Sequence, residues 1–181
     1  MAGTDDRPSA DARTSREDIG RPSVRTSDSQ RGGRKQEREG METKKILVPT
    51  DGSPYTRNAV EAAIHVAQVT DARITALYVV DASTVSMARG DMYESVTEIL
   101  NEEGKKAVDE VEAMCDAAGV PVEKMIVGGR PADKIIEMSR DYDLIVMSTL
   151  GKTGISKYLI GSVAEKVVRM AECRVLTLRA H

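Results

Sequence analysis

Short apolar runs alternate with amphipathic segments along the chain from residue 44 onward. The runs that predict β-strands are Lys45–Pro49, Ile74–Val80, Val122–Val127, Asp143–Met147 and Arg174–Leu178. The segments between them predict helices over about 54–69, 93–118, 131–140 and 161–171. Strands separated by helices indicate βαβ units with right-handed crossovers. We therefore expect an α/β fold: an open, parallel, five-stranded sheet with helices on both faces.

Local signals mark the ends of the first two predicted helices. Ser53 is expected to be the N-cap of the first helix, with Pro54 at its first position. The long second helix is expected to stop at Gly119, which Pro121 follows. In parallel sheets of this kind, ligands bind at the carboxyl ends of the strands, close to where the strand order reverses. The site is therefore expected in the loops that follow the strands.

The first 40 residues differ in composition from the rest of the chain. They hold only six apolar residues, and their eight arginines are interleaved with eight acidic residues. Such a stretch buries too little apolar surface to offset about 1–2 kcal/mol of backbone entropy per residue. We predict a disordered polar tail over 1–40 and one domain over 41–181. A start codon placed too far upstream of Met41 would also explain the tail.

Composition narrows the class of protein. Phe and Trp are absent, so the core is expected to be aliphatic, and the net charge of −3 gives no basic surface for nucleic acid. No apolar run approaches the roughly 18 residues of a membrane span, and the N-terminus has no apolar secretory segment. Two widely separated cysteines are typical of reduced thiols. We expect a cytoplasmic protein that uses neither a membrane nor a nucleic acid.

A glycine-rich loop between the fourth strand and the last helix carries the clearest chemistry. Gly151, Gly154 and Gly161 let the backbone approach a ligand, and Gly161-Ser162 opens a helix whose free N–H groups suit an anion. The tripeptide Gly151-Lys-Thr153 is not a Walker A motif, since Val146 stands where that motif needs a glycine. A dinucleotide-binding fingerprint is also missing after the first strand. A phosphate is nevertheless expected at the helix start.

Three stretches together resemble the universal stress protein family. Lys45–Ser53 is similar to the family's opening strand and acidic turn, and Val79-Val-Asp81 to the end of its second strand. Ser148–Ser162 is similar to its nucleotide loop, in which two residues and then nine residues separate three small positions. Two positions depart from the pattern: Ser148 replaces the first glycine, and Leu150 stands where many members carry histidine.

The resemblance implies a Rossmann-like fold similar to that of adenine nucleotide alpha hydrolases, and a site for ATP, ADP or AMP. By resemblance, Asp51 lies near the nucleotide and helps to hold Mg²⁺ or Mn²⁺, while the loop begins at Met147 and Ser148. The residues implied for adenine and ribose are Pro49, Thr50 and Val79. The residues implied for the phosphates are Gly151, Gly161, Ser162 and Val163.

Asp51 and Lys152 each have a second interpretation that is equally consistent with the sequence. Asp51 is also typical of an Asx-turn that shapes the loop after the first strand. Lys152 either neutralises phosphate charge or is a solvated loop lysine.

The residues show no nucleophile or general base arranged for catalysis. We expect a nucleotide-binding regulatory or protective stress-response protein, with no catalytic residue. The alternatives are a stress protein that acts through protein partners without nucleotide, and a slow ATPase. The last strand, Arg174–Leu178, is expected at a sheet edge, where unpaired backbone groups favour a homodimer. The resemblance implies the same dimer.

Overall fold

The computed structural model describes residues 43–87, 92–152 and 160–179. The tail predicted over 1–40 and Gly154 lie outside the described residues. By its contacts the chain divides into Met1–Gln36 and Glu37–His181. The fold below is that of the described part of the second unit.

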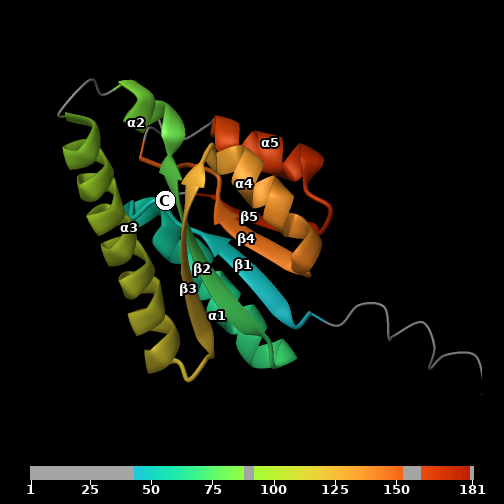
Figure 1. Ribbon diagram of the computed structural model, residues 1–181. Helices are drawn as coiled ribbons and strands as arrows, with labels where there is room; N and C mark the ends of the chain where they lie inside the picture. Colours follow the sequence, from blue (N-terminus) through green and yellow to red (C-terminus); the bar gives the residue numbers. More distant parts are fainter. Residues whose placement is uncertain (1–42, 88–91, 153–159, 180–181) are drawn as a thin grey trace, which may run out of the picture. The chain divides into compact units, whose positions relative to one another are not determined.

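Five parallel strands form one sheet (Figure 1). They are β1 (Lys45–Pro49), β2 (Arg73–Asp81), β3 (Val122–Gly129), β4 (Leu144–Ser148) and β5 (Arg174–Leu178). Their spatial order is β3-β2-β1-β4-β5, so the order reverses between β1 and β4. This confirms the predicted α/β class, the parallel sheet and the position of the last strand at an edge.

Helices connect the strands and cover the sheet on two sides. They are η2 (Pro54–Thr56), α1 (Arg57–Thr70), α2 (Ala82–Met87), α3 (Met92–Ala117), α4 (Pro131–Met138), η3 (Ser139–Asp141) and α5 (Ser162–Met170). Helices α1 and α3 pack on one face, and α4 and α5 lie together on the other (Figure 1). Because helices cover both faces of the sheet, the central parallel strands are buried on both sides. This burial explains why their sequences are continuous apolar runs.

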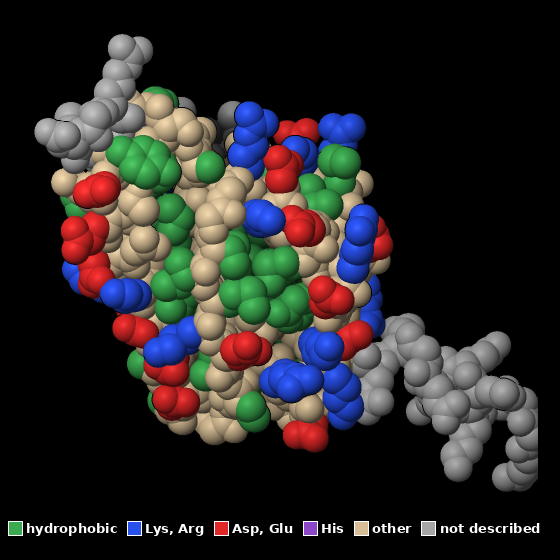
Figure 2. All heavy atoms as spheres, in the orientation of Figure 1, with side chains coloured by type: hydrophobic (Ala, Val, Ile, Leu, Met, Phe, Trp, Pro, Cys, Tyr) green, Lys and Arg blue, Asp and Glu red, His purple; other side chains and the backbone are tan. Residues whose placement is uncertain are grey.

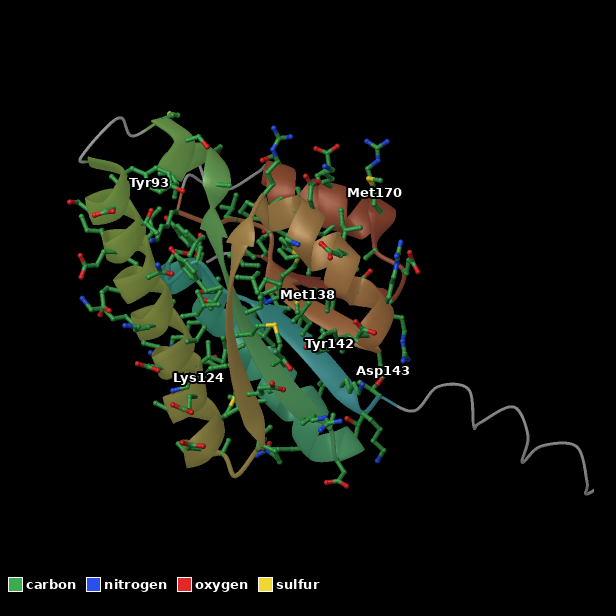
Figure 3. The ribbon with its side chains drawn as sticks, viewed as in Figure 1. Tyr93, Lys124, Met138, Tyr142, Asp143 and Met170 are labelled. Atoms are coloured by element: carbon green, nitrogen blue, oxygen red, sulfur yellow. The ribbon has the colours of Figure 1, made fainter. Side chains whose placement is uncertain are left out.

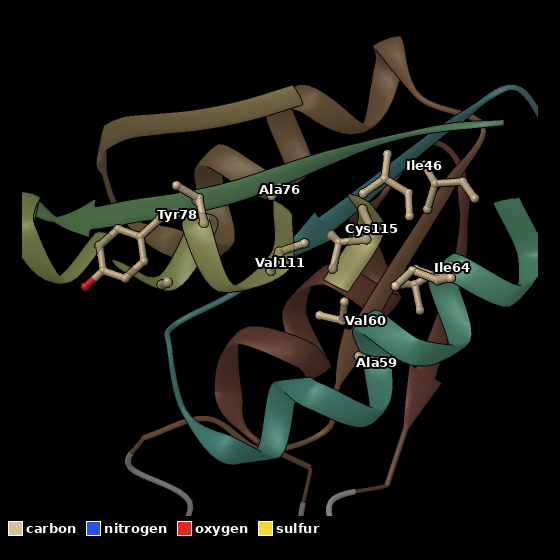
Figure 4. Packing of buried hydrophobic residues seen from close by; sticks show 14 of the residues in the cluster. Ile46, Ala59, Val60, Ile64, Ala76, Tyr78, Val111 and Cys115 are labelled. Carbon is tan, nitrogen blue, oxygen red and sulfur yellow. The ribbon is translucent and has the colours of Figure 1, made fainter. Parts of the chain in front are cut away.

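Strand β1 shows how one short run fills two cores. Ile46 and Val48 face α1 and α3, whereas Leu47 between them faces α4 and α5, and all three are fully buried. Figure 4 shows the first core, in which Cys115 of α3 packs with aliphatic side chains. Burial raises the pKa of the Cys115 thiol to about 11, so this cysteine is a packing residue.

The edge of the sheet formed by β3 is less completely covered on the face where α4 lies (Figure 2). Figure 2 shows hydrophobic side chains gathered between β3 and α4 on this face. Met125, Val127 and Met138 are half-buried against the second core. Among the described helices, none combines the length and apolarity that crossing a membrane requires.

Four local details differ from the sequence expectations. Helix α2 was not expected, because its sequence Ala-Ser-Thr-Val-Ser-Met has little apolar periodicity. Ser53 does hold the N-cap position with Pro54 after it, but its hydroxyl makes no capping bond and is buried without a partner. The first turn after Ser53 is a short 3-10 helix that precedes α1. The helix that was predicted to run to Arg140 is α-helical only as far as Met138 and continues as the 3-10 helix η3. The end of α3 matches, with Gly119 at a φ of 68°.

Candidate functional site

A cavity of about 380 Å³ lies at the carboxyl edge of the sheet, where the strand order reverses. Its volume is typical of small-molecule sites, and its position is where ligands bind in open α/β sheets. Its walls come from the turn after β1, the end of β2, α3, α4, the loop after β4 and the first turn of α5. All ten residues that the family resemblance implies for the site line it: Pro49, Thr50, Asp51, Val79, Met147, Ser148, Gly151, Gly161, Ser162 and Val163. Their roles toward a nucleotide stay predictions.

Asp51 fastens two loops together at the cavity wall. Its Oδ1 accepts a hydrogen bond from the N–H of Ser53 at 3.0 Å, which is the Asx-turn bond. Its Oδ2 accepts the N–H of Lys152 at 2.6 Å, from a loop 101 positions further along the chain. The turn-shaping role is therefore present, and the same carboxylate also sets the distance between the β1 turn and the glycine-rich loop.

Gly151 is a glycine because of the space that Asp51 occupies. A Cβ at residue 151 would lie 2.4 Å from Oδ2 of Asp51, a separation that real Cβ atoms do not show. Its φ is outside the left-handed region, so conformational freedom is not what this position needs. The loop glycines were expected to let a ligand approach the backbone closely. At Gly151 the group that lies so close is the Asp51 carboxylate of the protein itself.

Gly161 places the start of α5 at the cavity. Its N–H donates to the carbonyl of Thr149 at 2.7 Å, and a Cβ at this position would lie 3.2 Å from the same oxygen. The first intrahelical bond runs from the N–H of Glu165 to the carbonyl of Gly161. The N–H groups of Ser162, Val163 and Ala164 therefore have no intrahelical acceptor, and all three residues line the cavity. Such a helix start is suited to an anion.

Ser148 fits its position without backbone strain. Among the described residues other than glycine, Asp71 alone has a positive φ, so Ser148 does not require a glycine's conformation. The Ser148 hydroxyl accepts a hydrogen bond from the N–H of Leu150 at 3.2 Å. Ser148 and Leu150 are both buried and both line the cavity. The two departures from the family pattern are thus part of the wall.

Sequence reasoning missed the contribution of α3. Leu100 and Glu103 line the cavity from this helix, and Oε2 of Glu103 lies 2.7 Å from Nζ of Lys152. Sequence patterns could not predict this contact, because nothing local indicates a partner 49 positions away. The Lys152 side chain is thus a cavity residue in an ion pair. Its hydrogen bond to Glu103 raises the Lys152 pKa.

Tyr78 of β2 was also missed; it lines the cavity and packs against α3. Its ring packs so closely on Gly104 that a Cβ there would lie 2.7 Å from Cδ1 of the ring. Burial raises the pKa of the Tyr78 hydroxyl above its usual value. The hydroxyl is therefore neutral at physiological pH, and Tyr78 adds no charge to the site.

The charge lining the cavity is mainly negative. Asp51, Asp81 and Glu103 contribute carboxylates, and Lys152 is the only cationic side chain among the described lining residues. Within the described residues no three acidic, histidine or cysteine side chains cluster as a ready-made metal site. Mg²⁺, however, is commonly bound by one or two carboxylates together with substrate phosphates and water. Asp51 therefore fits a cation that arrives with a phosphate ligand.

The chain matches known proteins over most of its length. A family model described as the universal stress protein family matches residues 42–179. The chain is 42% identical over 139 residues to Universal stress protein MJ0531 of Methanocaldococcus jannaschii, covering 75% of this chain and 82% of that protein.

Solved structures share the fold. Universal stress protein UspA from Lactobacillus plantarum superposes with a TM-score of 0.67 at 28% identity, covering 76% of this chain and 99% of that one. A universal stress protein family protein from Arabidopsis thaliana, solved with AMP bound, gives a TM-score of 0.56 at 22% identity. That match covers 76% of this chain and 92% of the plant protein, and at this identity it shows the fold alone.

Proposed function

Because this chain belongs to the universal stress protein family, we propose that it binds an adenine nucleotide, ATP with a divalent cation, in the cavity at the carboxyl edge of the sheet. The observation that carries the proposal is the start of α5, whose free N–H groups open into a cavity that also contains the Asp51 carboxylate. The AMP in the plant structure of the same fold belongs to the same ligand class. The bound protein acts as a regulatory or protective component of a cytoplasmic stress response.

Each part of the nucleotide has a matching part of the wall. Pro49, Thr50 and the backbone of Val79 offer an apolar and hydrogen-bonding surface for adenine and ribose. Gly151 and the first turn of α5, from Gly161 to Val163, hold the phosphates. A bound Mg²⁺ or Mn²⁺ supplies positive charge that offsets the phosphates, and Asp51 is the residue that holds it.

Calorimetry of the purified protein with ATP, with and without Mg²⁺, tests the proposal. The wild type is expected to bind with Mg²⁺ at sub-millimolar ligand. Gly161→Val is expected to abolish binding, because a branched side chain would stand beside the Thr149 carbonyl where the phosphates approach. Gly128→Val is the matched control, since a Cβ at Gly128 meets nothing within 4 Å. Absence of wild-type binding at millimolar ATP would overturn the proposal.

We also propose that two copies of the chain pair through β5. Strand β5 lies at the edge of the sheet, and within it Leu176 is 38% exposed. An edge strand leaves backbone N–H and C=O groups unpaired, and an antiparallel copy across a two-fold axis satisfies them and closes the assembly. The strand contains no proline, and Arg174 is its only charged residue.

Light scattering at tens of micromolar protein tests the dimer. The wild type is expected to be dimeric, and Leu176→Pro to shift toward monomer because proline removes one N–H and bends the strand. Circular dichroism checks that the variant folds. A monomeric wild type would contradict the proposal, and a folded Leu176→Pro variant that stays dimeric would place the interface elsewhere.

A further inference from the structure

Lys152 is held from two sides by carboxylates that line the cavity. Its backbone N–H donates to Asp51 Oδ2 at 2.6 Å, and its Nζ lies 2.7 Å from Glu103 Oε2. These contacts join the glycine-rich loop to the β1 turn and to α3. The cation that could meet a phosphate is therefore paired with a carboxylate of the protein itself.

Glu103 and a phosphate ligand would compete for the ammonium group of Lys152. A polyphosphate entering the cavity meets the carboxylates of Asp51, Asp81 and Glu103. The Lys152 ammonium offsets that charge for the ligand only after it leaves Glu103. The side chains of Lys152 and Glu103 are 47% and 45% exposed, and exposed ion pairs of this kind are weak. A phosphate can therefore displace Glu103 from Lys152 at little cost.

Glu103 itself is fixed in position by the packing of α3. One residue further on, Gly104 lies directly against the ring of Tyr78. One turn further on, Ala107 lies against Gly52 of the β1 turn, where an added Cβ would come within 3.2 Å of the Ala107 methyl group. The helix has no room to move toward the sheet, so the exchange between partners involves the side chains of residues 103 and 152.

We propose that Glu103 is a specificity-determining residue of the nucleotide site. It holds Lys152 in the free protein and gives it up to the phosphates of a bound nucleotide. It thereby sets how much more tightly ATP binds than adenosine, which has no phosphate to attract Lys152. This inference rests on the proposed nucleotide site and concerns its preference among ligands.

Paired titrations with ATP–Mg²⁺ and with adenosine test the role of Glu103. Glu103→Gln is expected to bind ATP about twofold to fivefold more tightly, the effect of losing a weak exposed competitor, with adenosine affinity unchanged. Glu112→Gln is the matched control, because it removes the same charge from the same helix and breaks the 2.6 Å pair with Lys124 outside the cavity. It is expected to change neither affinity. Weaker ATP binding by Glu103→Gln would overturn the proposal, since Glu103 would then hold the ligand or its cation.

The same substitution in a Lys152→Met background separates exchange from simple repulsion. If Glu103 acts by holding Lys152, the gain from Glu103→Gln falls to less than half when the lysine is gone. A gain of undiminished size would mean that Glu103 only repels phosphate through space, and would overturn the proposal.

Exchange of the Lys152 ammonium protons with water, followed by NMR in protein without added nucleotide, gives a readout of the contact between Nζ and Glu103 that does not depend on ATP. Faster exchange in Glu103→Gln than in wild type supports the holding contact, and an unchanged rate overturns it. Failure of wild type to bind ATP would remove the proposed function, whereas an unchanged exchange rate would remove the contact itself. The two failures are therefore distinguishable.

Discussion

Asp51 and Asp143 perform the same hydrogen-bonding task at opposite ends of the sheet. Asp51 joins the β1 turn to the glycine-rich loop by accepting two backbone N–H groups. Asp143 stands just before β4 and joins it to the start of β1, where its Oδ2 accepts the N–H groups of Lys44 and Lys45 at 2.8 and 2.9 Å (Figure 3). Each carboxylate connects segments about 100 positions apart in the sequence.

The surroundings of the two aspartates differ. Asp143 has Lys45 and Arg174 near it, and its hydrogen bond from the Lys44 N–H is the main reason that its pKa is lowered. Asp51 faces a cavity, beside a glycine and the open start of α5. A carboxylate bound to two amides is thus a general device for joining loops to strands. Asp51 differs in having a cavity in front of it and unpaired N–H groups of α5 across that cavity. These two features make Asp51, and not Asp143, part of a candidate ligand site.

Substituting each aspartate by asparagine gives the largest expected contrast. Asp51→Asn is expected to weaken ATP binding in the presence of Mg²⁺ by about tenfold or more, because the amide lacks the charge that holds a divalent cation. Asp143→Asn is expected to change that affinity by less than about twofold, since it lies at the other end of β4 and outside the cavity. Isothermal titration calorimetry of both variants measures the contrast. Equal losses in the two would show that the effect is not specific to the carboxylate in the cavity, and would contradict the role of Asp51 in holding the cation.

An effect on stability rather than on binding is expected when Gly151 is replaced by alanine. The new Cβ would lie 2.4 Å from Asp51 Oδ2, so the loop must shift, and overpacking of this kind costs about 1–3 kcal/mol of unfolding free energy. In an Asp51→Ala background the obstructing oxygen is gone, and the same substitution is expected to cost less than half as much. Urea denaturation of the four proteins in this cycle measures the coupling. Additive costs would indicate that the space at Gly151 is limited by something else.

The smallest effect concerns the stability that Asp143 provides. Its lowered pKa means that its contribution is fully present above the unfolded value of about 4 and is lost as the pH falls through the folded pKa. Asp143→Asn is therefore expected to destabilise the protein by about 1 kcal/mol at pH 7, a value discounted for solvent exposure. The difference from wild type shrinks as the pH falls below about 4. Denaturation curves at pH 7 and pH 3 check this, and a constant difference would contradict it.

The sequence predicted what depends on local periodicity and on small-residue spacing. All five strands were located to within two residues, and the family resemblance, to which the spacing between Gly151 and Gly161 contributed, implied residues that line one cavity. What it could not predict depends on contacts between distant segments. The pairing of Glu103 with Lys152 and the packing of Tyr78 on Gly104 arise from where α3 docks.

Two local features were also beyond the sequence. Helix α2 has too few apolar positions to be recognised by periodicity. The reason for a glycine at 151 became visible only with the carboxylate of Asp51 placed beside it.

The contact between Tyr78 and Gly104 makes the side chain that fits at one position depend on the side chain at the other. A glycine inside a helix costs about 1 kcal/mol relative to alanine, so substitution at 104 would by itself strengthen α3. The ring of Tyr78 leaves no room for that methyl group, so a smaller residue must first arise at 78. Tyr78 also forms part of the cavity wall. A more stable α3 obtained with a smaller residue at 78 and alanine at 104 would therefore come with a wider ligand cavity.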